Sequence, residues 1–252
     1  MNKFPISLDR FIYEVRYGSG YRYYDRCGQS IMDIMRELDG WFPVAANTQT
    51  GTLEKPDKSF VMSFSDSIFN FTADKSYKTT VEEIADEVSN LWKIIQVNLD
   101  LEEFTRLATR LYNLMPCLSI EDAERKLGKS VLNVVIPANV ESNFNIKNRH
   151  VIIVFESNNI EYRVSLNTVT RYEGIQPSDI LKLDPRFLSK DQKKYRHAKQ
   201  QQITEYSANP MYAIALDIDC VSVQPETVKV KEFIFEQQEE INRYFMPILE
   251  HL

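Results

Sequence analysis

The stretch Glu102-Glu-Phe-Thr-Arg-Leu-Ala-Thr-Arg-Leu-Tyr-Asn-Leu-Met-Pro116 decides the fold of this chain. Its side chains alternate between two sides, with Arg106, Ala108 and Arg110 on one and Leu107, Thr109 and Leu111 on the other. A period of two is typical of a β-strand with one polar and one buried face. The stretch directly follows an amphipathic helix, and this order of elements predicts an α+β fold in which the helix lies across a sheet.

The helix before this strand has a clear start signal. Thr80 and Glu83 form a capping box, in which each side chain accepts a hydrogen bond from the backbone N–H of the other residue. Apolar residues then recur every three or four positions from Val81 to Leu99, so that one face of the helix is apolar. We expect this face to pack against the strands that precede it.

The rest of the first part of the chain alternates strands and helices. The pattern predicts a strand over Arg10–Tyr17, a helix with an apolar stripe from Ile31 to Trp41, and a hairpin over Ser59–Ala73 that turns at Ser65–Ser67. A short helix over Ser119–Lys126 follows, with Ser119 as its N-cap.

The second part has a similar order of elements. Strands over Val151–Phe155 and Ile160–Tyr172 flank Ser157–Asn159, which is typical of a hairpin turn. A polar stretch rich in breaker residues precedes a strand over Met211–Cys220. The last element is a helix that runs from about Val230 to Leu252, and Pro247 is expected to kink or weaken its last turns.

These elements predict two pseudo-duplicated halves, each a mostly antiparallel sheet packed against a long amphipathic helix. The halves are residues 1–118 and 131–252, and residues 119–130 form the connecting helix. With 252 residues, the chain is long enough for either two domains or one compact unit.

Composition narrows the class of protein. Hydrophobic residues make up 43% and charged residues 26%, as in ordinary globular proteins. The net charge of −6 disfavours bulk binding to nucleic acid or anionic membranes. Because the sequence has no signal-like N-terminus and no apolar run of the roughly 20 residues that span a bilayer, we expect a cytoplasmic protein without membrane contact.

Metal and cofactor chemistry have little support. Cys27, Cys117 and Cys220 are an odd number of cysteines without a CxxC pair, which predicts free and mostly buried thiols. The sequence contains no GxxxxGK[ST], GxGxxG, GxSxG or HExxH motif and only 7 glycines. We therefore expect no cofactor, and the missing motifs make an enzymatic function less expected.

Three segments together resemble a known family. They are Ile12–Tyr17, Phe104–Asn113 and Ala215–Asp219, the last of which precedes the terminal helix. The family is a sporadically distributed prokaryotic one of uncharacterised function, whose members have about the length of this chain, 252 residues. The resemblance implies no activity, and the patchy occurrence of the family implies a link to mobile or defence loci. The family has a glycine where this chain has Ala108, so a close approach at that position is not expected here.

The central strand supplies the first candidate site. Arg106 and Arg110 share a face with Tyr112, and their guanidinium groups could hold a phosphate or a carboxylate. The favoured interpretation is that they line the solvent face of a sheet or pair with Glu14 and Glu161 on neighbouring strands.

Two carboxylates form a second candidate. Asp217 and Asp219 project to one side of their strand and could bind a divalent cation or act as an acid–base pair. No third ligand can be placed beside them from the sequence, so our main expectation is that no metal binds.

A basic segment is the third candidate. Its charged residues are Arg186, Lys190, Lys193, Lys194, Arg196 and Lys199. They could contact nucleic-acid phosphates or an acidic protein surface, but a solvated mobile loop is the favoured interpretation.

Near the first turn, aromatic and basic residues alternate. The tyrosines are Tyr17, Tyr21, Tyr23 and Tyr24, and the arginines are Arg16, Arg22 and Arg26. Such side chains are favoured in recognition surfaces, and they could equally cover the edge of the core.

The sequence leaves two functions open. The leading one is a non-enzymatic module that binds a protein partner, for which Arg16, Tyr21, Arg22 and Tyr23 are candidate contacts together with the arginine strand and the basic segment. The alternative is a metal-dependent phosphoesterase or nuclease that uses Asp217 and Asp219, with Arg106 and Arg110 holding phosphate. A homodimer through a sheet edge or the terminal helix is a further expectation.

Overall fold

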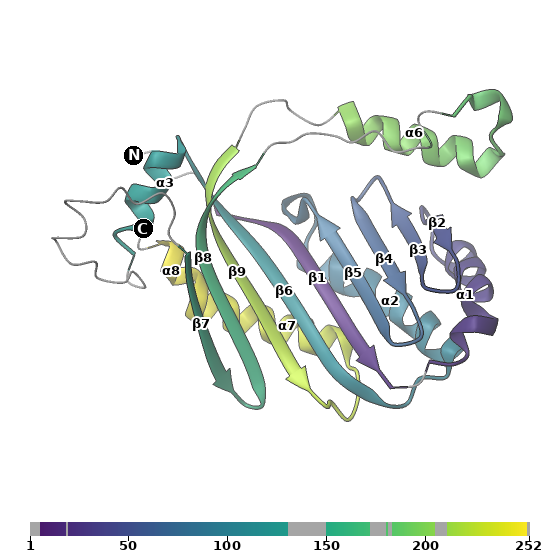
Figure 1. Ribbon diagram of the computed structural model, residues 1–252, viewed down its shortest axis with the longest axis horizontal. Helices are drawn as coiled ribbons and strands as arrows, with labels where there is room; N and C mark the ends of the chain where they lie inside the picture. Colours follow the sequence, from purple (N-terminus) through teal and green to yellow (C-terminus); the bar gives the residue numbers. More distant parts are fainter. Residues whose placement is uncertain are drawn as a thin grey trace.

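One antiparallel sheet runs through the described chain. The computed structural model describes residues 6–18, 20–130, 150–171, 180, 183–204 and 211–250, and in them nine strands pair in the order β2-β3-β4-β5-β1-β6-β9-β8-β7 (Figure 1). The strands are β1 (Ser7–Tyr17), β2 (Phe42–Ala46), β3 (Gly51–Lys55), β4 (Phe60–Phe64), β5 (Ile68–Asp74), β6 (Phe104–Cys117), β7 (His150–Ser157), β8 (Ile160–Arg171) and β9 (Met211–Val223). The long central strands β1, β6 and β9 are neighbours, although residues far apart in sequence form them.

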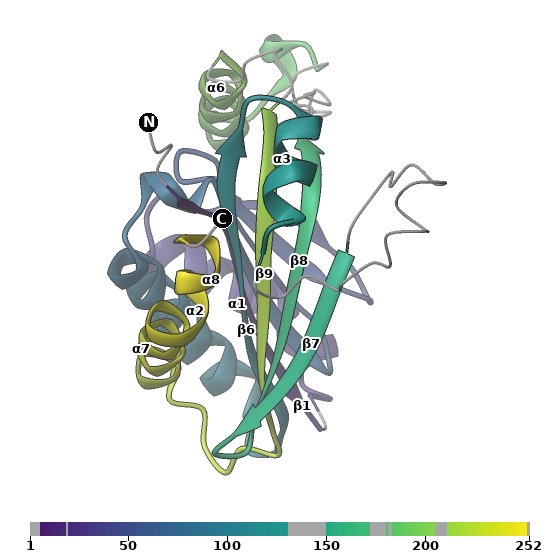
Figure 2. The same ribbon diagram turned by 90° about the vertical axis from the view of Figure 1, so that its left-hand side faces the viewer.

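Most helices cover one face of this sheet. The α-helices are α1 (Tyr23–Glu37), α2 (Val81–Leu99), α3 (Ile120–Leu127), α6 (Lys190–Thr204), α7 (Val230–Glu240) and α8 (Met246–Glu250), and the short segments are η1 (Ser76–Lys78), η2 (Pro185–Phe187) and η3 (Ile241–Phe245). Helices α1, α2, α7 and α8 lie on the same side of the strands, as Figures 1 and 2 show. The opposite face of β1, β6 and β9 has no described helix over its middle, and we call it the uncovered face.

The main core lies between the sheet and its helices. Leu107 and Leu111 of β6 are buried there, so the predicted alternation of this strand is confirmed. Trp92 of α2 lies at the centre of an aromatic cluster, with ring centroids 5.4 Å from Phe69 and 5.9 Å from Phe104. Burying such large apolar side chains is the main source of stability in a fold of this kind.

Several short-range predictions are confirmed. Thr80 Oγ1 accepts from the N–H of Glu83 at 3.1 Å, and the Glu83 side chain accepts from the N–H of Thr80 at 3.2 Å. Ser119 caps α3 by accepting from the N–H of Asp122. Asn158 and Asn159 both have positive φ, 51° and 63°, and they form the two-residue turn between β7 and β8, while Ser157, also predicted in the turn, is the last residue of β7.

The prediction of a separate sheet in each half is corrected. β6 pairs with β9 from Arg106↔Val223 to Cys117↔Tyr212, and this pairing joins the strands of both halves into one sheet. The duplication of the halves and their boundaries stay predictions. Residues 131–149, with which the predicted second half begins, lie outside the described residues, as do Tyr172 and Leu252.

Three further features differ from the sequence pattern. The hairpin of β2 and β3 was not predicted, because its short strands lack a clear alternation. Helix α1 ends at Glu37, so the buried Trp41 lies beyond the helix to which its spacing assigned it. The terminal helix changes to π-helical geometry over Ile241–Phe245, directly before α8 and its Pro247.

Candidate functional site

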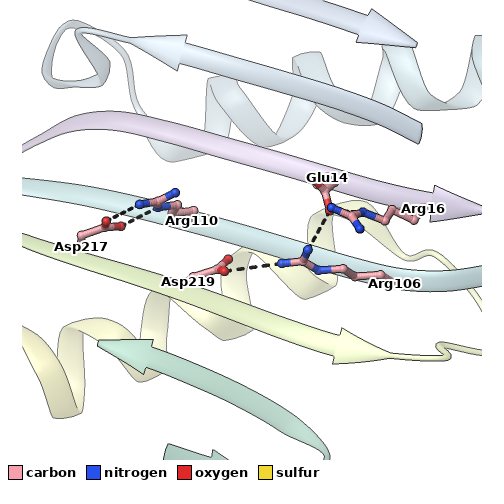
Figure 3. A network of polar contacts seen from close by, with 6 residues as sticks. All are labelled: Glu14, Arg16, Arg106, Arg110, Asp217 and Asp219. Carbon is pink, nitrogen blue, oxygen red and sulfur yellow. Dashed lines mark hydrogen bonds and ion pairs between the residues drawn. The ribbon is translucent and has the colours of Figure 1, made fainter. Parts of the chain in front are cut away.

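Arginines and carboxylates of three strands meet on the uncovered face. Arg110 of β6 lies beside β9, where its Nε and Nη2 donate to Oδ1 and Oδ2 of Asp217 at 2.7 and 2.5 Å (Figure 3). A guanidinium group that binds both oxygens of a carboxylate is fixed in orientation as well as in position.

The second arginine of β6 joins carboxylates of two strands. Arg106 contacts Glu14 of β1 at 3.2 Å and Asp219 of β9 at 3.4 Å. Glu14 also accepts from Nε of Arg16 at 2.8 Å, so that the contacts cross from β1 through β6 to β9 (Figure 3). We call Glu14, Arg16, Arg106, Arg110, Asp217 and Asp219 the charge ladder. The predicted pairing of the arginine strand with Glu14 is confirmed, and no described contact joins it to Glu161.

The charge ladder is partly withdrawn from water. The side chains of Asp217 and Glu14 are 13% and 17% exposed, whereas that of Arg110 is 50% exposed. Burial raises the pKa of Asp219, and the neighbouring Arg106 and Arg110 act in the opposite direction. The hydrogen bond to Asp217 raises the pKa of Arg110. Desolvated charges of both signs therefore hold one another in place.

A hollow of about 410 Å³ adjoins the charge ladder. Arg110, Tyr112, Asp217 and Asp219 line it from β6 and β9, and β7 and β8 complete it with residues that include His150, Arg163 and Ser165. The His150 ring contacts the Ser165 hydroxyl at 2.7 Å. A smaller hollow of about 300 Å³ is lined by Arg106 and Ala108. Arg110 and Asp219 line both this hollow and the larger one.

The sequence analysis missed the contribution of β7 and β8. Ile152, Arg163 and Ser165 are alternate residues of the predicted hairpin, and His150 directly precedes its first predicted strand. Period-two counting could therefore have placed all four on one face. Counting could not show that this face continues the one that carries Arg110, because that depends on the pairing of β8 with β9.

The metal alternative gains no third ligand from the described residues. Over that part of the chain, no group of three or more His, Cys, Asp or Glu side chains is arranged to hold a metal ion. Both carboxylate oxygens of Asp217 already accept hydrogen bonds from Arg110. Metal binding by Asp217 and Asp219 stays a prediction.

The aromatic and basic cluster near the first turn divides between core and surface. Tyr23 is 1% exposed and donates to the carbonyl of Asn47, so it is a core residue and not a surface contact. Tyr21 is 76% exposed, and Arg22 forms an ion pair with Asp100 at 2.8 Å. A binding role for Tyr21 and Arg22 stays a prediction.

Most of the basic segment is helical, which corrects the expectation of a mobile loop. Its residues from Lys190 to Lys199 lie in α6, and Arg186 lies in η2, where it pairs with Asp184. In α6, the Tyr195 hydroxyl donates to Glu54 of β3 at 2.9 Å, and Lys199 forms an ion pair with the same carboxylate. The Tyr195 ring also lies 5.4 Å from that of Phe42 in β2, measured between centroids. Lys190, Lys193 and Lys194 are exposed and Arg196 is half-buried, and their predicted contacts with a ligand are untested.

The three cysteines agree with the sequence prediction of free and mostly buried thiols. Cys27 and Cys220 are buried, Cys117 is half-buried, and all three are free thiols. Within the described ranges, no helix has the length and apolar character needed to cross a bilayer.

No protein-family model and no curated protein matches this sequence. The resemblance to a sporadically distributed prokaryotic family stays a prediction, and the function is inferred from the geometry.

Proposed function

We propose that this protein is a non-enzymatic recognition module that binds a protein partner through the charge ladder and the adjoining hollow. The observation that carries the proposal is the ordering of partly buried charges on a face whose middle no described helix covers. Such a set is already oriented before a partner arrives, so less side-chain entropy is lost on binding.

The balance of charge favours a protein over a nucleic acid. Asp217 engages Arg110, and both Glu14 and Asp219 engage Arg106, so that a phosphate would have to displace a carboxylate that is already bound. A protein surface can offer groups of both signs and meet the ladder without breaking it. The net charge of −6 also opposes a polyanion.

The cellular setting is part of the same proposal. We place the module in the cytoplasm, where free thiols such as Cys27 and Cys220 stay reduced. Its prokaryotic origin and its connection with a mobile or defence locus are what the resemblance implies. The proposed binding face rests only on contacts between the described residues and does not depend on the cellular setting.

A charge-swap capture experiment tests the binding face. Tagged protein is used to capture partners from lysate after nuclease treatment, and the Arg110→Asp/Asp217→Arg double variant is compared with the native chain. The double variant keeps an ion pair across β6 and β9 but reverses its polarity towards a partner. A matched control is Lys229→Glu/Glu232→Lys, which swaps an exposed ion pair of 2.8 Å at the start of α7.

We expect the native chain and the control to capture the same protein in stoichiometric amount. The ladder swap should weaken its binding at least about tenfold, which corresponds to about 1.4 kcal/mol of binding free energy. Equal capture by the ladder swap would contradict the proposed face. A different result would favour the hydrolase alternative: the native chain hydrolyses a phosphoester in the presence of a metal ion, and the folded Asp219→Asn variant does not.

A further inference from the structure

The two edges of the sheet are built differently. The edge strand β2 contains Pro43 and an irregular register between Pro43 and Ala45, both of which hinder the addition of another strand. The edge strand β7 pairs with β8 without a register shift, from His150↔Asn167 to Ser157↔Ile160, and has no proline. Among the described residues, only the β2 edge therefore carries such protection.

Strand β7 also presents an apolar surface at its edge. Its residues Val151–Phe155 are all apolar, and the side chains of Ile152 and Val154 are 44% and 55% exposed. Among the described residues, no strand pairs with its outer edge. A straight, apolar and unpaired edge is what strand addition requires.

The turn between β7 and β8 determines which backbone N–H and C=O groups of β7 do not bond to β8. Because Asn158 and Asn159 form a two-residue turn, Ser157 and Ile160 are a hydrogen-bonded pair. Pairs of this kind alternate along an antiparallel ladder, so Val151, Ile153 and Phe155 also bond to β8. The N–H and C=O groups of the alternate residues His150, Ile152, Val154 and Glu156 point away from the sheet.

We propose that a second copy of this chain adds its β7 antiparallel to this edge, with the two-fold axis at Ile153. This register pairs the outward backbone groups of both strands. It sets Ile152 against Val154 of the partner subunit and His150 against Glu156 of the partner subunit. The exposed aliphatic side chains then cover one another, and an imidazole meets a carboxylate at each end of the contact.

The dimer would place the partner subunit next to the hollow that adjoins the charge ladder. His150 and Ile152 line the hollow from β7, so the strand of the partner would extend the same face directly beside it. Both charge ladders would then lie on one continuous sheet. The inference does not depend on the proposed function, because the edge can dimerise whatever the uncovered face binds.

A matched pair of substitutions tests the interface in solution. Val154 and Val44 are half-exposed valines on opposite edge strands, with 55% and 49% exposure. We expect the full-length chain to sediment as a dimer, and Val154→Lys to raise the dissociation constant at least about tenfold. The Val44→Lys control is expected to leave the dimer unchanged, and circular dichroism checks that both variants are folded.

Cross-linking tests the register independently. Across the two-fold axis, Ile153 and its symmetry mate form a non-hydrogen-bonded pair with Cα atoms about 4.5 Å apart, within reach of a disulfide. With copper–phenanthroline as the oxidant, the Ile153→Cys variant is expected to form a covalent dimer. Ser157→Cys is the control, since its two copies would lie about 27 Å apart at about 3.4 Å per residue.

Either of two results would overturn the inference. One is a monomer at every concentration tested. The other is a dimer that Val154→Lys does not weaken and that the Ile153→Cys variant does not cross-link, which would place the contact elsewhere on the surface.

Discussion

Arg110 and Asp217 show how single residues organise the uncovered face. The two lie 107 positions apart in sequence, yet the guanidinium group binds both carboxylate oxygens. An exposed ion pair contributes little to stability, but the side chain of Asp217 is only 13% exposed and would lose hydrogen bonds that water only partly replaces.

We expect Arg110→Ala to lower the free energy of unfolding by about 1 kcal/mol, at the upper end for such pairs. Removing both partners in Arg110→Ala/Asp217→Ala should cost less than the sum of the single changes, because no carboxylate is then left without its donor. Urea unfolding of the four proteins measures this coupling. Strictly additive losses would show that the pair contributes nothing as a pair.

Asp219 gives the ladder a dependence on pH. Burial raises its pKa in the folded protein above the value in the unfolded chain, so the folded state binds the proton more tightly. The resulting stabilisation is fully present below the ordinary aspartate pKa, and it is lost as the pH rises through the raised value.

The free energy of unfolding of the native chain, relative to that of Asp219→Asn, should therefore fall as the pH rises from about 4. Urea unfolding of both proteins across the acidic and neutral range tests the sign. A difference that grows with pH would mean that Arg106 outweighs burial at this site.

At the scale of elements, local signals position helix α2 beneath the sheet. The Thr80 hydroxyl satisfies a backbone donor that would otherwise lack a partner at the start of the helix. This contact lies within one turn of chain, which is why the sequence alone could predict it.

Thr80→Ala should lower the free energy of unfolding by about 1 kcal/mol, the usual cost of a lost N-cap. Thr80→Ser keeps the hydroxyl and serves as the control, with a much smaller change expected. Thermal and urea unfolding measure both. An equal loss in the two variants would assign the effect to the threonine methyl group instead of the cap.

The basic helix α6 shows where local signals fail. Its sequence has no apolar stripe, and the helix is held to the sheet by Tyr195, which contacts Phe42 and Glu54, and by Lys199, which pairs with Glu54. Those partners are more than 140 positions away in the chain. Charge composition alone favoured a mobile loop, because periodicity cannot reveal a contact at this separation.

At the scale of the whole molecule, the pairing of β6 with β9 makes one sheet from the two predicted halves. The main apolar core likewise contains residues of both, including Trp92 and Ile218. Unfolding one half would expose the core and the strand edge of the other, so we expect a single cooperative transition.

The positions of the tryptophans make this testable. Trp41 and Trp92 both lie in residues 1–118, so fluorescence reports the first half, whereas far-ultraviolet circular dichroism reports both halves. The two signals should give the same midpoint in urea. Separate midpoints would show that the halves unfold independently and would support the predicted domain boundary.

The sequence by itself determined the features that depend on neighbouring residues: the two faces of β6, the capping box of α2, the cap of α3 and the Asn158–Asn159 turn. Each follows from a side-chain period or from a contact across a few positions. Only the tertiary structure decided that β6 lies between β1 and β9, that Arg106 joins Glu14 to Asp219, and that β7 is the last of the described strands, with a regular edge. Alternation assigns a side chain to a face, but it does not specify which distant strand will lie beside it.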